Sequence, residues 1–152
     1  MPIGLLILIP LAYLIGSIPF GLLVGFAKGI DVRTAGSNNI GATNVGRLLG
    51  KKFFFLVFFL DMAKSLIPMA IASALVFRVT PGARDWYVYL LWLSVGFVAV
   101  LGHMFSIFLR FKGGKGVATS AGVLLGLFPY YTWPGLIAIL VFVASYAVWR
   151  YI

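Results

Sequence analysis

The chain is poor in the residues that carry most enzyme chemistry. It has 152 residues and no cysteine, which excludes a disulfide, a thiolate nucleophile and a cysteine-based metal site. It has no glutamate, and it has only three aspartates and one histidine. From so few groups we can assemble neither a carboxylate pair, nor a Ser-His-Asp set, nor a metal-ligand cluster. We therefore expect no metal and no cofactor, and an enzyme built from this sequence would act by positioning and electrostatics.

Charged residues are also scarce. They make up 10% of the chain, against about 25% in soluble domains, while 62% of residues are hydrophobic and the mean hydropathy is +1.10. This composition predicts an all-α membrane protein, a polytopic transmembrane helical bundle with residues 1–152 in a single membrane-embedded domain. In a membrane protein the net charge of +9 indicates cationic loops that orient helices and contact anionic lipid, not nucleic acid.

Four apolar regions are long enough to cross a membrane, which takes about 20 residues. They cover about 3–26, 53–77, 86–109 and 116–149. The first is uncharged from Met1 to Ala27, longer than the apolar core of a signal peptide, so we expect it to be retained as a span. The fourth is too long for one span and contains Pro129 and Pro134, so we expect a short helix to about Phe128 and a longer one from about Thr132. The prediction is four to five membrane helices.

Basic residues predict the topology. The connections at 28–52 and 110–115 are rich in Lys and Arg, whereas the turn at 78–85 has two Arg and one Asp. The positive-inside rule places the first and third connections in the cytoplasm and the N-terminus outside. The two polar loops then share the cytoplasmic face.

The loop Gly36-Ser37-Asn38-Asn39-Ile40-Gly41-Ala42-Thr43-Asn44 gathers small polar residues between two apolar regions. It offers uncharged donors, and the guanidinium of Arg47 follows with a geometry that matches phosphate oxygens. An alternative interpretation is a helix N-cap and turn, positions that Ser and Asn favour. Because the loop shares a face with a second basic loop, we favour a phosphate site.

The second loop reads Lys112-Gly113-Gly114-Lys115-Gly116-Val117-Ala118-Thr119. Glycines let backbone N–H groups approach a phosphate, and a helix that opens at Val117 would add its positive end. The loop is not a nucleotide P-loop, because Gly116 stands where Ser or Thr should follow the lysine. The alternative is a flexible turn whose lysines serve only the topology.

Three further polar residues lie within apolar regions. Asp61 and Lys64 are three residues apart on one helix face, where charges are costly unless they are paired or face a polar cavity. We favour a mutually neutralising structural pair, with a substrate-facing Lys64 as the alternative. His103 is a candidate general base, but Phe108 occupies the position where a His-x4-Asp acyltransferase dyad needs aspartate, so we favour a local hydrogen-bonding role.

Five patches together carry a resemblance to a known family. They are Gly16-Ser17-Ile18-Pro19-Phe20-Gly21, the GSNNIGATN loop with Arg47, Leu60-Asp61-Met62-Ala63-Lys64, Gly102-His103 and FKGGKGVAT. In order and spacing they resemble the bacterial acyl-phosphate-dependent glycerol-3-phosphate acyltransferases, the PlsY family. The resemblance implies a multi-pass bundle in the bacterial inner membrane with its active site facing the cytoplasm. It implies acyl transfer from acyl phosphate to the 1-hydroxyl of glycerol 3-phosphate, giving lysophosphatidic acid and phosphate in phospholipid biosynthesis, without metal or acyl-CoA.

The resemblance also implies roles for individual residues. Ser37, Arg47 and Lys115 would grip glycerol 3-phosphate. The acyl-phosphate pocket would be lined by Asn39, Thr43, Gly113, Gly114 and Gly116, with Asn44 as a further polar contact. Apart from the resemblance, Asp61, Lys64 and His103 are candidate supporting residues, because they are polar groups within apolar regions. The family's usual glycine is Asn38 here, a residue that adopts positive φ more readily than most.

Other expectations follow from the same resemblance. The family continues beyond the last residues of this chain, so we expect a form shortened at the C-terminus. The partners would be glycerol 3-phosphate, acyl phosphate and membrane lipid, with the protein a monomer. Two other functions stay open, a small carrier that binds phosphate between broken helices and an inactive membrane fragment.

Overall fold

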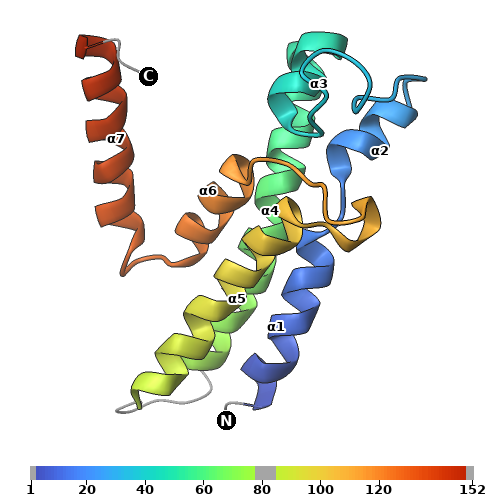
Figure 1. The fold of residues 1–152 in the computed structure, drawn as a ribbon. Coiled ribbons are helices and arrows are strands. Elements are labelled where there is room, and N and C mark those ends of the chain that lie inside the picture. The colour runs from blue at the N-terminus through green and yellow to red at the C-terminus, as the bar shows by residue number, and fades with distance from the viewer. Residues whose placement is uncertain (1–2, 78–84, 150–152) are drawn as a thin grey trace.

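The computed structural model describes residues 3–77 and 85–149, and every element in these ranges is a helix (Figure 1). In chain order they are α1 (Ile3–Gly16), α2 (Phe20–Phe26), α3 (Ala42–Leu49), α4 (Lys51–Phe77), α5 (Trp86–Met104), the 3-10 helix η1 (Ile107–Leu109), α6 (Val117–Gly126) and α7 (Thr132–Trp149). The all-α prediction is confirmed.

Three of the segments are long and apolar enough to cross a membrane, namely Ile3–Phe26, Lys51–Phe77 and Trp86–Leu109. They agree with the first three predicted regions to within two residues at each end. The fourth region divides as expected, into α6 and α7. Because α6 is only 10 residues long, the total of four to five membrane helices stays a prediction.

The bundle is built around α1, α4 and α5, with α6 packed along α4 and α1 packed along α5. One core cluster joins them, made of Leu5, Leu8, Ala12, Met69, Ala72, Val76, Trp92, Val95 and Ala99. Large apolar side chains such as Phe59, Ile67 and Phe97 stay more than half exposed. A helix that is apolar on every side is typical of a membrane span, because lipid takes the place of water.

A second core cluster lies beneath the polar loops. It is made of Leu22, Val32, Ile40, Ala42, Val45, Val57 and Leu109, and so joins α2, the loop after it, α3, the first half of α4 and η1. This packing fixes the loop of residues 27–41 against the end of the bundle that carries the basic residues.

The first predicted span is not continuous, which corrects the expectation of one helix over 3–26. The chain is interrupted at Ser17, Ile18 and Pro19, between α1 and α2. Backbone groups freed inside a membrane must find partners within the protein. Here the Ser106 hydroxyl donates to the Ser17 carbonyl at 2.6 Å, and Lys64 Nζ donates to the Ile18 carbonyl at 2.9 Å. The break therefore brings the end of α1, the middle of α4 and the end of α5 together.

The last helix lies apart from the others. Figure 1 shows α7, in red, separate from the bundle and joined to it through α6, the helix that it contacts. The Thr132 hydroxyl donates to the Leu124 carbonyl at 2.7 Å, which ties the start of α7 to the end of α6. The polar loops and their site depend on the remaining helices.

Candidate functional site

The first polar loop is held in shape by Asn44 from the first turn of α3. Its Oδ1 accepts the Ser37 N–H at 2.8 Å, and its Nδ2 lies 2.9–3.0 Å from the carbonyl oxygens of Val32, Ala35 and Asn39. The side chain is 1% exposed. Both of its polar atoms thus bind the backbone of the loop. In the structure Asn44 therefore holds the loop in the shape that positions Ser37. Its assignment as a substrate contact stays a prediction.

The turn within this loop follows the predicted chemistry in part. Asn38 has a φ of 56°, so the expectation that it takes the left-handed conformation of the usual glycine is confirmed. The Asn39 Oδ1 accepts the Gly41 N–H at 2.9 Å, a local turn of the kind that Asn favours. The N-cap interpretation is wrong, because the cap of α3 is Gly41 and makes no side-chain capping bond.

The second polar loop folds back on the end of α5. The N–H groups of Gly113 and Gly114 donate to the carbonyls of Met104 at 2.9 Å and His103 at 3.0 Å. A Cβ at Gly113 would collide with the His103 carbonyl oxygen, and one at Gly114 with His103 Nε2. These two glycines permit close packing on α5, and their N–H groups are not free for a phosphate, which corrects the expected reason for them.

Free backbone donors lie one step further along the chain. Gly116 has a φ of 78° and forms the N-cap of α6, so the expectation that a helix opens at Val117 is confirmed. Ser120 is the first residue to bond back, with its N–H on the Gly116 carbonyl at 2.7 Å. The N–H groups of the first turn before it therefore have no acceptor within the helix, and the positive end of α6 points to the loop junction.

The two loops meet in a cavity of about 300 Å³. Of the predicted residues it is lined by Ser37, Asn39, Thr43, Asn44, Arg47, Asp61, His103, Lys115 and Gly116, and also by Gly41, Ala42, Phe54, Phe58, Val117 and Ala118. Three predicted residues, Gly113, Gly114 and Lys64, do not line it. The cavity thus combines α3, α4, α5 and the start of α6.

The cavity is electropositive. Arg47 and Lys115 are exposed, and neither forms an ion pair with any residue in the described ranges. Asp31, the carboxylate of the first loop, is bound by Arg33 at 2.7 Å, and the side-chain hydrogen bond from Arg33 lowers the pKa of Asp31 from its ordinary value. Two uncompensated cations among neutral donors favour an anion with several oxygen atoms.

A buried polar cluster forms the floor of the cavity. Lys64 Nζ lies 2.8 Å from Asp61 Oδ1 and 2.8 Å from His103 Nδ1, and the three residues are 2–4% exposed. The expected pairing of Asp61 with Lys64 is confirmed. The contact with Asp61 is an ion pair whose angle does not suit a hydrogen bond, since Oδ1 has no aligned donor among the described residues. Lys64 faces inward from the cavity, as a structural partner does.

The reasoning from sequence missed two groups that shape the site. Phe54 and Phe58 of α4 line the cavity with their rings stacked at 5.9 Å between centroids. Phe58 follows Phe54 by four residues and Asp61 follows Phe58 by three, so the three residues share one helix face, a spacing readable from the sequence. The carbonyl of Ile18, which holds Lys64, depends on the break between α1 and α2 and has no signal of its own beyond the Gly-Ser-Ile-Pro sequence.

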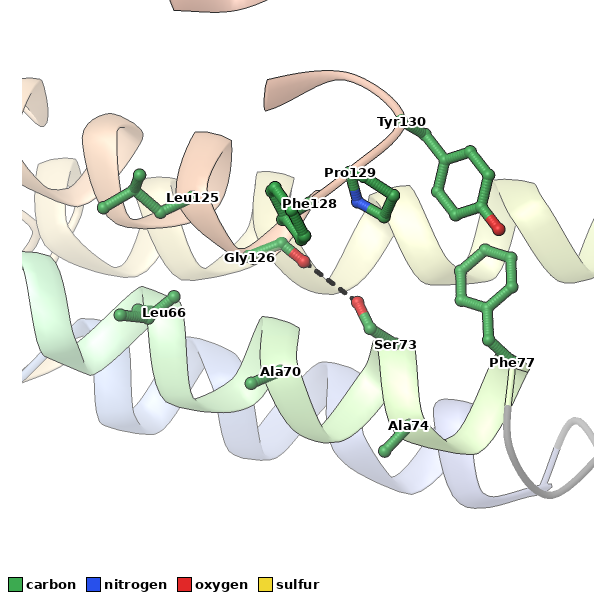
Figure 2. Close-up of a pocket in the computed structure, with 10 residues that line it drawn as sticks. All are labelled: Leu66, Ala70, Ser73, Ala74, Phe77, Leu125, Gly126, Phe128, Pro129 and Tyr130. Carbon is green, nitrogen blue, oxygen red and sulfur yellow. Dashed lines mark hydrogen bonds between the residues drawn. The ribbon is translucent and has the colours of Figure 1, made fainter. Parts of the chain in front are cut away.

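A larger cavity of about 480 Å³ lies elsewhere, between α4, α6 and the turn that follows α6. Figure 2 shows its lining, which is apolar except for Ser73 and Tyr130, and the hydrogen bond from the Ser73 hydroxyl to the Gly126 carbonyl. The rings of Phe77 and Tyr130 stack at 4.9 Å. With no charged side chain in its lining, this cavity suits no anion, and the smaller cavity is the candidate site.

Comparisons with known proteins show which family the chain resembles. The profile of the family described as glycerol-3-phosphate acyltransferase matches residues 6–152. The glycerol-3-phosphate acyltransferase of Geotalea daltonii is 45% identical over 148 residues, which cover 97% of this chain and 69% of the relative. That of Myxococcus xanthus is 49% identical over 144 residues, covering 94% of this chain and 69% of the relative.

Solved structures give the same result. The crystal structure of PlsY (YgiH), an integral membrane glycerol 3-phosphate acyltransferase, in its glycerol 3-phosphate form has a TM-score of 0.77 and 42% identity, covering 97% of this chain and 68% of that one. The lysophosphatidic acid form has a TM-score of 0.74 and 42% identity, covering 94% and 65%.

Proposed function

The chain belongs to the glycerol-3-phosphate acyltransferase family, and we propose that it transfers a fatty acyl group from acyl phosphate to the 1-hydroxyl of glycerol 3-phosphate. The products are lysophosphatidic acid and inorganic phosphate, a step of phospholipid biosynthesis. The observation that supports this most is the cavity in which Arg47 and Lys115 stand uncompensated among small neutral donors. Both proposed substrates carry a phosphate, and one wall of the cavity is apolar.

The residues divide into two groups by position. Ser37, Arg47 and Lys115 hold the phosphate of glycerol 3-phosphate, because they combine a hydroxyl with two exposed cations. Asn39, Thr43 and the free N–H groups at the start of α6 receive the acyl phosphate. The stacked rings of Phe54 and Phe58 lie against the first carbons of the acyl chain.

The reaction needs little from the protein beyond placement. The 1-hydroxyl oxygen attacks the acyl carbonyl carbon, a new C–O ester bond forms, and the bond from that carbon to the phosphate oxygen breaks. The hydroxyl proton passes to a phosphate oxygen, which makes the substrate its own base. His103 does not serve as that base, because its Nδ1 accepts from Lys64 and its Nε2 then carries the proton of the neutral ring. Holding two phosphates and a hydroxyl in register accounts for the acceleration.

We further propose that the protein lies in the bacterial inner membrane as a monomer with its cavity on the cytoplasmic side. The basic residues of the loops at 28–52 and 110–115 support this side. Glycerol 3-phosphate, a charged metabolite, then reaches the site from water, and the acyl donor reaches it from the lipid.

The activity is tested by reconstituting the purified chain in liposomes with glycerol 3-phosphate and palmitoyl phosphate. Phosphorus NMR follows loss of the acyl phosphate and the appearance of lysophosphatidic acid and phosphate in equal amounts. Palmitoyl-CoA is the control donor and is expected to give no product. A folded chain that binds glycerol 3-phosphate yet forms no ester would contradict the proposal, and phosphate flux across the same liposomes would then favour a carrier.

A further inference from the structure

The ammonium group of Lys64 has a complete set of partners. Its nitrogen donates to the Ile18 carbonyl oxygen at 2.9 Å, contacts His103 Nδ1 at 2.8 Å, and lies 2.8 Å from Asp61 Oδ1. A lysine ammonium carries three N–H groups and accepts nothing. Two hydrogen-bonding partners and one carboxylate around a buried nitrogen match the charged form, because the Asp61 carboxylate balances that charge through the ion pair.

This arrangement decides where the imidazole proton sits. Because the ammonium donates, Nδ1 of His103 must accept, and a neutral imidazole then carries its proton on Nε2. A doubly protonated ring would direct an N–H at the ammonium and place two like charges 2.8 Å apart. The cluster therefore holds His103 as a neutral ring with an Nε2–H donor.

The Nε2 end of the ring lies away from the contact that Nδ1 makes with Lys64. It lies against Gly114, where a Cβ would collide with it, and His103 lines the cavity beside Lys115 and Gly116. No described residue hydrogen-bonds to Nε2, and the atom is absent from the buried polar atoms that lack a partner. The donor is thus not fully buried, has no partner of its own in the described ranges, and belongs to a ring that lines the cavity.

We propose that His103 Nε2–H donates a hydrogen bond to a phosphate oxygen of the ligand bound in this cavity, and that Asp61 and Lys64 position it by fixing its tautomer. The identity of that phosphate rests on the proposed function, in which the acyl phosphate lies nearest the start of α6. Gly114 belongs to the same arrangement, because a Cβ at this position would displace Nε2 of the His103 ring. The role is that of a donor, the reverse of a general base.

The tautomer is measurable without any activity. The chain has one histidine, so ¹⁵N-histidine labelling in detergent or nanodiscs gives one pair of ring-nitrogen signals. We expect a protonated Nε2 and an unprotonated Nδ1. Replacing both buried charges with Asp61→Asn and Lys64→Met leaves no unpaired charge and should let the Nδ1–H form appear. A ring protonated on Nδ1 in the unmodified chain overturns the proposal.

Ligand contact is read from the same signal. Inorganic phosphate, glycerol 3-phosphate and palmitoyl phosphate are titrated separately, and the Nε2–H resonance should move with at least one of them. Movement with palmitoyl phosphate alone assigns the contact to the acyl donor, and movement with glycerol 3-phosphate alone assigns it to the acceptor. A resonance that stays fixed while the ligand binds elsewhere in the cavity, as a shift of labelled Arg47 would report, contradicts the contact.

Two isosteric variants separate donation from packing. His103→Gln carries an amide N–H near the position of Nε2, whereas His103→Asn can still accept from Lys64 but does not reach the cavity. We expect the Gln variant to keep ligand affinity within about threefold and the Asn variant to lose about 10- to 150-fold, the range for a hydrogen bond to a charged group, with equal unfolding midpoints. Equal affinities would make His103 a structural residue only. Because the readout is binding, an inactive chain leaves this test intact, and an active chain with a normal Asn variant removes this inference alone.

Discussion

Lys112 and Lys115 lie in one loop, but their surroundings differ. Lys115 lines the cavity, whereas Lys112 does not. The backbone N–H of Lys112 donates to the Leu109 carbonyl at the end of η1, at 3.1 Å. We expect Lys115→Ala to lower affinity for glycerol 3-phosphate by about 10- to 150-fold, because a hydrogen bond to a charged group contributes about 1.5–3 kcal/mol. Lys112→Ala is the matched control and should change affinity by less than about threefold, as isothermal titration would measure. Equal losses would mean that the loop acts through its total charge.

Arg47 offers a second test at the scale of one side chain. Its guanidinium is exposed at the cavity and has no described ionic partner, so its geometry is available for a phosphate. Lysine keeps the charge but cannot bind two oxygens side by side. Arg47→Lys should raise the Michaelis constant for glycerol 3-phosphate about tenfold or more and leave that for acyl phosphate nearly unchanged. Kinetics identical to the unmodified chain would reduce Arg47 to a topology residue.

Residue types and spacing predicted which side chains meet, but not what each one does there. Ser37, Arg47 and Lys115 were found together because two loops were placed on one face by charge. The roles of Asn44, Gly113 and Gly114 could not be read in the same way. Whether an amide or an N–H faces a ligand or its own backbone depends on how the loop closes, and that closure rests on the second core cluster, which packs residues far apart in sequence.

At the scale of whole helices, hydropathy located the spans but not the break in the first one. The mean hydropathy over a window does not reveal an interruption at Ser17, Ile18 and Pro19, because both flanking segments are apolar. Besides local backbone hydrogen bonds, such as that of the Ser17 N–H to the Tyr13 carbonyl, the break is stabilised by partners from elsewhere in the chain, Lys64 of α4 and Ser106 after α5. These are tertiary contacts, which the hydropathy of a single segment does not predict.

The contact of α1 with α5 gives a prediction with an internal control. Gly16 ends α1 so close to α5 that a Cβ would collide with the Ala99 carbonyl oxygen. A Cβ at Gly4, near the other end of the same helix, would meet the two methyl carbons of Leu75, Cδ1 at 3.2 Å and Cδ2 at 3.7 Å, which are the flexible end of a side chain. We expect Gly16→Ala to lower the free energy of unfolding in detergent by about 1–3 kcal/mol through overpacking.

Gly4→Ala should be neutral or stabilise by up to about 1 kcal/mol, because alanine favours the helix. Chemical unfolding in mixed micelles, followed by tryptophan fluorescence, compares the two variants. If both lose stability equally, the close approach of α1 and α5 at Gly16 is wrong.

At the scale of the molecule, two independent arguments place the loops at 28–52 and 110–115 on one face. Charge does so through the positive-inside rule, and geometry does so because residues of both loops line one cavity. Between them α4 and α5 cross twice and return the chain to the same side. The α4 helix has 27 residues and is about 40 Å long, enough for a tilted span. Only the charge distribution, however, indicates whether that face is the cytoplasmic or the outer side of the membrane.

The absence of cysteine makes the side directly measurable. Single replacements at exposed positions, Thr34→Cys and Lys112→Cys on the two polar loops and Asp85→Cys before α5, report with no background. In intact spheroplasts a membrane-impermeant maleimide should label only Asp85→Cys, and in inverted vesicles only the other two, because the cytoplasmic loops carry the excess of Lys and Arg. If Thr34→Cys and Lys112→Cys reacted on opposite sides of the membrane, the two loops could not line one cavity. The reverse labelling of all three would keep the cavity but move it to the outer face, where glycerol 3-phosphate from the cytoplasm could not reach it.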